Sequence, residues 1–225
     1  GVLRKGGPKP TDGSNKPGPD LDHFRFESEE PGVEVIFRSK YGETPREVDI
    51  LLPYKTTDEN FEAWQEEWVA GGLVHRCDGQ YCVVWQDRRS GLFHTWRAGD
   101  PGPRLPCPYA DVPARKDKGC KAIGRLTVII DAFQRHGHVT VLTTSLHDIM
   151  TIEENLRGIE LLTGRLRGIP MILARRERVV STPGPQGKRV RRKKSLLSVE
   201  ADPRWVTFQL EAMRHRIAGL HRDWA

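Results

Sequence analysis

The four cysteines are the residues of this chain best suited to hold a metal ion. They stand as one pair separated by four residues and a second pair separated by twelve. Thiolates bind zinc well, and a structural zinc usually takes four tetrahedral ligands from two loops. The predicted zinc ligands are Cys77, Cys82, Cys107 and Cys120. His75 or His94 could replace one cysteine, and a set of free or buried thiols is the alternative.

A second group of residues predicts binding of nucleic acid. Between Arg165 and Lys194 the chain carries eleven Lys or Arg residues and a single acid, Glu177, whereas the net charge of the whole chain is only +6. An ordered element with this charge density attracts a phosphate backbone. The predicted nucleic-acid-binding residues are Arg165, Arg167, Arg175, Arg176, Arg178, Lys188, Arg189, Arg191, Arg192, Lys193 and Lys194.

Runs of charge are often only solvated faces, so the basic segment has an alternative interpretation. Here the basic residues repel one another with almost no acids between them, which destabilises the fold unless a polyanion or an acidic partner relieves it. Val190, Leu196 and Leu197 lie in the same run and indicate a packed strand. We therefore predict contact with nucleic acid, with an acidic protein surface as the main competitor.

Ser145, His147 and Asp148 have the residue types of a catalytic triad, but their spacing argues against one. The members of a triad usually converge from distant parts of the chain. Ser145-x-x-Asp148 instead matches a capping pattern at the start of a helix. No G-x-S-x-G, H-E-x-x-H, P-loop or G-x-G-x-x-G motif is present. The sequence therefore predicts a protein without enzymatic activity.

The elements expected around these residues are clearest in the C-terminal half. Strands are expected at Arg125–Asp131 and His138–Thr144, followed by a helix at Asp148–Thr163. The basic residues then fall on a hairpin, Pro170–Val199, whose strands flank the turn sequence STPGPQG. A last helix is expected at Pro203–Asp223. Its apolar residues recur at steps of four and three and should face inward, and these are Val206, Leu210, Met213, Ile217 and Leu220.

The N-terminal half is expected to begin with three strands, His23–Ser28, Val33–Ser39 and Val48–Leu52. A helix is expected at Asp58–Ala70, because Phe61, Trp64 and Trp68 would share one of its faces. Residues 73–120 are irregular apart from a short hairpin. Aromatic residues there could stack on bases but are better explained as a small core, and they are Trp85, Phe93 and Trp96.

Together these elements predict an α+β fold. It would be either a small OB-like barrel or an antiparallel sheet, with a basic β-hairpin and flanking helices. Residues 1–20 are expected to form a flexible basic arm, and residues 21–225 a single domain with a Cys-rich subdomain inserted at 73–120. No apolar run is long enough to cross a membrane, and the first residues lack the apolar stretch of a signal peptide.

Several segments resemble the phage recombination directionality factor-like family, the accessory proteins of large serine integrases. The matching segments are DLDHFRF (Asp20–Phe26), LVHRCDG (Leu73–Gly79), CKAIGRLTVII (Cys120–Ile130), TTSLHDI (Thr143–Ile149), NLRGIELLTGRLRGIPMIL (Asn155–Leu173) and KSLLSVEADP (Lys194–Pro203). The resemblance implies an accessory protein that binds an integrase seated on its attachment sites and favours excision over integration.

The resemblance implies a serine integrase as partner, while the basic segment predicts DNA, single- or double-stranded. Members of this family need not bind DNA specifically themselves, so the basic segment could contact either nearby DNA or an acidic face of the partner. The resemblance also implies a location in the cytoplasm of a bacterial cell or phage-infected host. The alternative function is a sequence-independent single-stranded DNA-binding protein of a replication, recombination or defence system. In that case Arg175–Arg178 and Lys188–Lys194 would line the binding groove.

Overall fold

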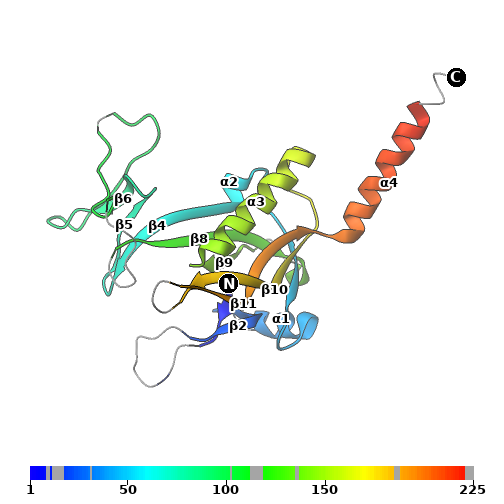
Figure 1. Cartoon of the computed structure of the whole chain (residues 1–225), viewed down its shortest axis with the longest axis horizontal. Helices are drawn as coiled ribbons and strands as arrows, with labels where there is room; N and C mark the ends of the chain where they lie inside the picture. Colours follow the sequence, from blue (N-terminus) through cyan, green and yellow to red (C-terminus); the bar gives the residue numbers. More distant parts are fainter. Residues whose placement is uncertain are drawn as a thin grey trace.

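The computed structural model in Figure 1 describes residues 1–8, 11, 18–30, 32–101, 103–111, 119–134, 137–184 and 188–220. Its centre is one large, mostly antiparallel sheet. Eight strands follow one another across it in the order β11-β10-β3-β8-β4-β5-β6-β7. In that order they are Arg189–Ala201, Met171–Pro183, Glu47–Leu51, Lys121–Ile130, Phe61–Val69, Gly72–Cys77, Cys82–Gln86 and Phe93–Thr95.

Three further strands branch from this order: β1 (Val2–Gly6), β2 (Asp20–Glu27) and β9 (Val139–Thr143). β9 pairs with β8, and β1 pairs in parallel with β9 and antiparallel with β2. The described strands do not close into a cylinder. The prediction of an α+β fold is therefore confirmed in its open-sheet form, and an OB-like barrel is not found.

Within the described ranges, four α-helices accompany the sheet, and the longest two are α3 (Leu146–Thr163) and α4 (Pro203–Leu220). α3 lies across one face of the sheet, where Asn155 Nδ2 donates to the carbonyl oxygen of Val199 on β11 at 3.1 Å. The buried apolar side chains of α3 belong to the main core, together with buried apolar side chains of β3, β8 and β10. None of the described helices is long and apolar enough to cross a membrane.

The segment expected as a strand at Val33–Ser39 is the helix α1 (Val33–Tyr41). Its β-branched residues favour a strand in isolation, but tertiary packing decides otherwise. Val33 and Phe37, one helical turn apart, are buried, and Phe37 stacks on Phe26 of β2 with ring centroids 5.2 Å apart. The neighbouring Val35 stays exposed, so the burial follows a helical period.

The prediction of a helix at Asp58–Ala70 is also wrong for most of that segment. Only α2 (Thr57–Asn60) is helical, and the chain then continues as the strand β4. β4 has a pairing partner on both edges, β8 and β5, and this hydrogen bonding outweighs the helical spacing of the aromatic residues. Phe61 is buried while Trp68 is exposed, so the expected aromatic face does not form.

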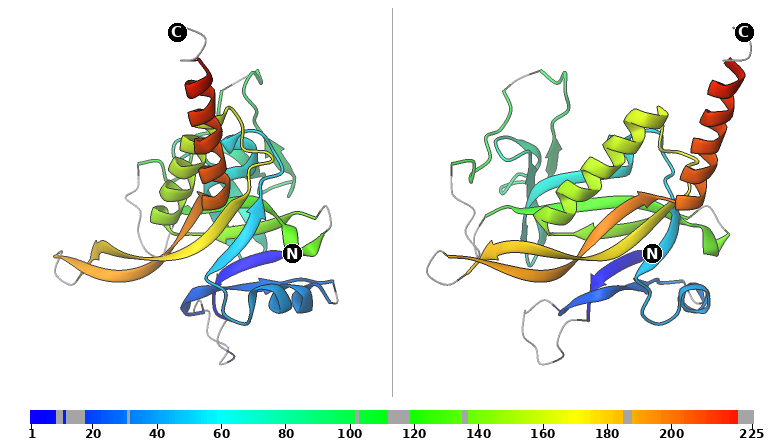
Figure 2. Two further views of the ribbon diagram at one scale, coloured as in Figure 1. Left: turned by 90° about the vertical axis from the view of Figure 1, so that its right-hand side faces the viewer. Right: turned by 45° about the vertical axis from the view of Figure 1, so that its right-hand side comes forward.

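Two other predictions for the chain ends need correction. Residues 2–6 of the expected flexible arm form β1, and Leu3 is fully buried in the main core. At the other end α4 points away from the body instead of packing on it (Figures 1 and 2). Val206, Leu210 and Met213 are exposed, against the prediction that they face inward. The side chains of Ile217 and Leu220, predicted to share that face, lie outside the described part of the structure.

Candidate metal centre and nucleic-acid interface

A compact group of four metal-binding side chains lies at the end of the molecule opposite α4 (Figure 1). It consists of His75, Cys77, Cys107 and Cys120, whose ligand atoms all lie within 4.8 Å of one another. His75 and Cys77 are two residues apart on β5, so their side chains leave the strand on the same side. Cys107 follows the bridge between Tyr81 and Pro106, and Cys120 immediately precedes β8.

The distances within this Cys/His cluster suit a tetrahedral ion. Cys120 Sγ lies 3.7 Å from Cys77 Sγ and 3.7 Å from Cys107 Sγ. A zinc–sulfur bond of about 2.3 Å implies a separation of about 3.8 Å between two sulfurs of a tetrahedron. His75 Nε2 is 3.0 Å from Cys120 Sγ and 3.6 Å from Cys107 Sγ. The corresponding nitrogen–sulfur separation would be about 3.5 Å, so the four atoms fit one small ion.

The other nitrogen of His75 is held by a carboxylate, which fixes the direction of the ring. His75 Nδ1 lies 3.1 Å from an Oε atom of Glu67 on β4. The Tyr109 hydroxyl donates to Glu67 at 2.8 Å, and the Tyr109 ring stacks on the imidazole. Metal-ligating histidines commonly make this second contact, which orients Nε2 toward the ion.

The cysteines are free thiols without disulfides. Burial raises the pKa of Cys77 to about 11 and also raises that of Cys120. Burial lowers the pKa of His75, and the nearby Glu67 opposes this effect. The imidazole is therefore disposed to be neutral, as a ligand must be. A bound divalent cation would deprotonate the thiols despite their raised pKa.

Three of the four predicted ligands, Cys77, Cys107 and Cys120, lie in this cluster, whereas the fourth, Cys82, lies outside it. Its thiol lies in the small core under the Cys/His cluster, with Sγ 3.9 Å from the carbonyl oxygen of Pro106. His75, one of the two proposed substitutes, takes the fourth place. His94, the other, stacks on Trp85 instead. The His75-x-Cys77 spacing on a strand was the signal that could have identified this set.

The basic hairpin forms as predicted from β10 and β11. The strands pair without a register shift from Met171 and Ala201 to Pro183 and Arg189. β3 pairs with β10 only over residues 171–174, so the hairpin then leaves the sheet. Figure 2 shows it projecting from the body as a twisted two-stranded ribbon. We call residues 177–183 and 188–194 the distal ribbon. The rest of the STPGPQG turn, residues 185–187, lies outside the described residues.

Seven of the eleven predicted nucleic-acid-binding residues lie on the distal ribbon and are exposed: Arg178, Lys188, Arg189, Arg191, Arg192, Lys193 and Lys194. Directly opposed residues of paired strands share a face. Arg178 opposes Lys194 on one face, and Val179 opposes Lys193 on the other. Lys193 pairs with Glu177 at 2.9 Å, whereas Arg191, Arg192 and Lys194 form no ion pair with any described residue. Both faces of the distal ribbon are therefore basic.

The other four residues lie elsewhere. Arg175 has a fully buried side chain, and its Nη2 donates to Asp20 at 3.0 Å and to the carbonyl oxygen of Leu21 at 2.5 Å. This burial removes Arg175 from the surface available to DNA. Arg176 is engaged by two carboxylates, Glu47 and Glu200. Arg165 and Arg167 are exposed in the loop between α3 and β10, away from the distal ribbon.

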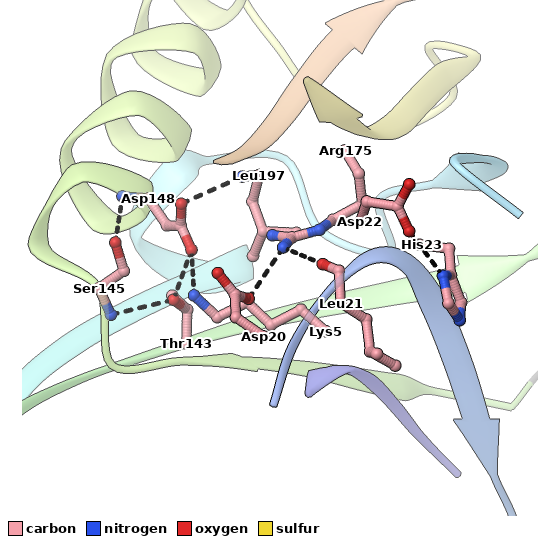
Figure 3. A network of polar contacts seen from close by, with 10 residues as sticks. All are labelled: Lys5, Asp20, Leu21, Asp22, His23, Thr143, Ser145, Asp148, Arg175 and Leu197. Carbon is pink, nitrogen blue, oxygen red and sulfur yellow. Dashed lines mark hydrogen bonds and ion pairs between the residues drawn. The ribbon is translucent and has the colours of Figure 1, made fainter. Parts of the chain in front are cut away.

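Figure 3 shows the buried contacts of Asp148, a residue of the rejected triad. Ser145 Oγ accepts a hydrogen bond from Asp148 N at 3.4 Å, so Ser145 caps α3 as predicted. The Asp148 carboxylate binds Lys5 at 2.5 Å and accepts from the backbone nitrogen of Leu197 at 3.1 Å. It thus joins β1, α3 and β11. His147 is exposed, so the three triad residues do not converge.

These features define an α+β protein with a Cys/His cluster at one end and a projecting basic β-ribbon. The family model Gp3-like, described as recombination directionality factor-like, matches residues 1–209. The chain therefore belongs to the recombination directionality factor-like family, as the sequence segments indicated. No curated protein and no solved structure matches the chain significantly.

Proposed function

We propose that the protein is a non-enzymatic accessory factor of phage DNA recombination, which binds a serine integrase on its attachment sites and contacts the DNA there. Its family membership supports the role in recombination. The observation that carries the DNA contact is the distal ribbon, which projects from the body with Arg191, Arg192 and Lys194 exposed and without an acidic partner among the described residues.

The shape of the distal ribbon suits a groove of duplex DNA. The major groove of B-DNA is wide enough to admit a two-stranded β-ribbon. In such a groove, long lysine and arginine side chains from either face of the ribbon can reach the phosphates of the two backbones that border it. Basic residues on both faces, such as Lys194 and Lys193, match that environment better than a ribbon with one charged face. Phosphate contacts of this kind position a protein without reading sequence, which fits a factor guided by a DNA-bound partner.

The proposal is tested by adding the purified protein to serine integrases, each acting on DNA that carries its own attachment sites. Excision and integration would be measured on DNA carrying the attachment sites, with and without the purified protein. We expect the protein to promote excision and to suppress integration. A ribbon variant should lose this effect, and its changes are Arg191→Glu, Arg192→Glu and Lys194→Glu. A matched control places the same charge change on exposed lysines of the body, with Lys40→Glu, Lys55→Glu and Lys121→Glu.

Three results would contradict this function. An unchanged direction of recombination with the wild-type protein would reject the accessory role. Equal loss in the ribbon and control variants would reject the distal ribbon as the DNA contact. Tight, sequence-independent binding of oligo-dT without any effect on the integrase would instead support the single-stranded DNA-binding alternative.

We also propose that the Cys/His cluster holds a structural zinc ion. The ligands would be His75, Cys77, Cys107 and Cys120, with Glu67 orienting the imidazole. When bound, the ion supplies a tetrahedral cross-link between β5, the loop around Cys107 and the start of β8. The surrounding apolar core is small, formed by three buried cysteines and a few neighbours. Four protein ligands leave no open position, so the ion would be structural rather than catalytic.

Metal analysis of the purified protein tests the zinc proposal. We expect about one zinc per chain, because a structural site is close to fully occupied. Cys120→Ser should lower the zinc content and loosen the Cys-rich end. Cys82→Ser is the matched control, since it removes a buried thiol outside the ligand set and should leave zinc bound. Wild-type protein that is folded with less than about half an equivalent of metal would reject the site.

A further inference from the structure

The helix α4 exposes an apolar surface that the body of the protein does not cover. Leu210 and Met213 are 49% and 53% exposed. At the end of α3, Leu161 and Leu162 are 86% and 84% exposed. Figure 2 shows α4 extending well beyond the sheet, with only its first turns close to α3. Apolar surface gathered in this way on a monomer commonly marks a binding site for another protein.

The exposed surface begins in a groove and continues along the helix. The groove lies between the start of α4 and the end of α3 and has a volume of about 620 Å³. Its apolar lining comes from Ile159, Leu162, Ile169, Trp205, Leu210 and Met213. Trp205 anchors α4 by packing against the main core. The groove is therefore built on a fixed part of the fold, and the projecting turns of α4 extend its apolar side outward.

The spacing of the apolar residues indicates what kind of element would cover them. From Val206 to Leu220 they recur at alternating steps of four and three. This is the a and d repeat of a coiled coil, in which a second helix packs its side chains between those of the first. A strand or a loop does not present apolar residues at this period. The complementary occupant is therefore an amphipathic helix.

Charge distinguishes a partner helix from a second copy of α4. The positions beside the seam set partner choice in coiled coils. In the described part of α4 they hold Thr207, Gln209 and Arg214, with no acid among them. An antiparallel pair of α4 helices would place Arg214 near its own copy, and a parallel pair would place it opposite Gln209. Arg165 adds a further cation at the groove. Acidic residues on the incoming helix would complement these cations.

We propose that α4 and the groove at its base dock an amphipathic helix of another protein, with acidic residues beside its apolar seam. The apolar seam supplies the buried contact, and Arg214 and Arg165 select the sign of the flanking charge. The surface lies on the opposite end of the molecule from the Cys/His cluster (Figure 1). This interaction does not require DNA, and it leaves open which protein of the recombination complex carries the helix.

The experiment uses the full chain and two synthetic helical peptides of three heptads. Both carry Ile and Leu at the seam positions, one with Glu and the other with Lys at all flanking positions. Binding of each labelled peptide is followed by fluorescence anisotropy. We expect the Glu peptide to bind at least tenfold more tightly than the Lys peptide. Leu210→Glu combined with Met213→Glu should abolish binding of the Glu peptide.

The control places a glutamate on the same helix but off the seam, and Leu210→Glu alone is the variant that matches it in charge. Phe208 lies on the same helix, is 65% exposed and is outside the repeat, so Phe208→Glu should retain binding to within about threefold. Circular dichroism would verify that the variants keep the wild-type helix content. Because the assay contains neither DNA nor integrase, failure of peptide binding would not contradict the proposed function. Likewise, failure of the recombination experiment would not contradict the docking of a helix on α4.

Three outcomes would overturn the inference. Equal binding of both peptides, or binding of neither, would show that the surface does not select an acid-flanked helix. A dimer in light scattering that Leu210→Glu dissociates would show that the occupant is a second copy of this chain. Retention of peptide binding after both seam substitutions would place the contact elsewhere.

Discussion

The two halves of the β10–β11 hairpin use the same residue type for different purposes. In the half next to the sheet, Arg175 is buried against Asp20, and Arg176 is held between Glu47 and Glu200. In the distal ribbon, exposed basic residues such as Arg192 have no acidic partner among the described residues. Local charge density alone does not distinguish the halves. The acids that neighbouring strands bring to the hairpin determine which cations remain available to a polyanion.

The largest effect should follow from reversing charge in the distal ribbon. The substitutions Arg191→Glu, Arg192→Glu and Lys194→Glu replace three attractive contacts with three repulsive ones. We expect the affinity for a short DNA duplex to fall by more than about 100-fold at roughly 0.1 M salt. The salt dependence of binding should weaken in parallel. Fluorescence anisotropy measures both, and an affinity within about threefold of wild type would show that the distal ribbon does not contact DNA.

The second-largest effect is a loss of stability, and it is expected from a substitution in the half of the β10–β11 hairpin next to the sheet. Arg176→Gln leaves Glu47 and Glu200 without their cation, and we expect a loss of up to about 1 kcal/mol, since the pairs are partly exposed. DNA affinity should stay unchanged. Urea unfolding at several pH values measures the loss.

The pH dependence of this variant follows from Glu200. The hydrogen bond from Arg176 holds the pKa of Glu200 below its usual range, although partial burial opposes this. A lowered carboxyl pKa contributes stability above the pKa of the unfolded chain, near about 4.3, and this is lost as pH falls through the folded pKa. The difference between wild type and Arg176→Gln should therefore be largest near neutral pH and should shrink in acid. A difference that grows in acid would contradict this pairing.

A single neutral change in the distal ribbon should have a smaller effect. Lys194→Gln removes one phosphate contact, and we expect a loss of DNA affinity of about fivefold at roughly 0.1 M salt. The slope of log affinity against log salt should fall by about one. The loss should be similar for unrelated duplex sequences. A loss confined to one sequence would instead indicate that Lys194 contacts base edges.

The smallest effect is expected for Arg175→Met. The Nε and Nη1 atoms of Arg175 are buried without a hydrogen-bond partner among the described residues, so the guanidinium is incompletely compensated. Removing one partner of a buried ion pair is costly when the other charge stays buried, but the Asp20 side chain is 51% exposed and would regain water. We therefore expect a change in unfolding free energy within about 1 kcal/mol. DNA affinity should also stay at the wild-type value. A clear loss of affinity with unchanged stability would restore Arg175 to the nucleic-acid interface.

The sequence was sufficient where local pattern and final packing agree. The hairpin, the strands β8 and β9 and the capped helix α3 all follow from period, turn residues and the Ser145 cap. Prediction from the sequence failed at β4 and α1, because strand partners and core contacts that are distant in the sequence decide there between strand and helix. No local pattern reveals that the strand β4 will find β8 on one edge and β5 on the other.

The candidate sites show the same limit. Three cysteines of the Cys/His cluster could be found from residue type, but the choice between Cys82 and His75 as its fourth member depends on which side of β5 faces the loop around Cys107. Similarly, the basic segment could be found by counting charges. The burial of Arg175 could not, because its partner Asp20 lies on a strand 155 residues earlier in the chain.

Site-specific photocrosslinking tests most directly whether the distal ribbon faces DNA. A photoreactive amino acid would replace Val179, which is exposed on the distal ribbon, or Leu161, which is exposed on the body at the end of α3. Each protein would be irradiated in complex with the integrase and its attachment-site DNA. We predict a crosslink to DNA from position 179 and none from position 161. Crosslinks from position 179 to the integrase alone, or to DNA equally from both positions, would contradict the account.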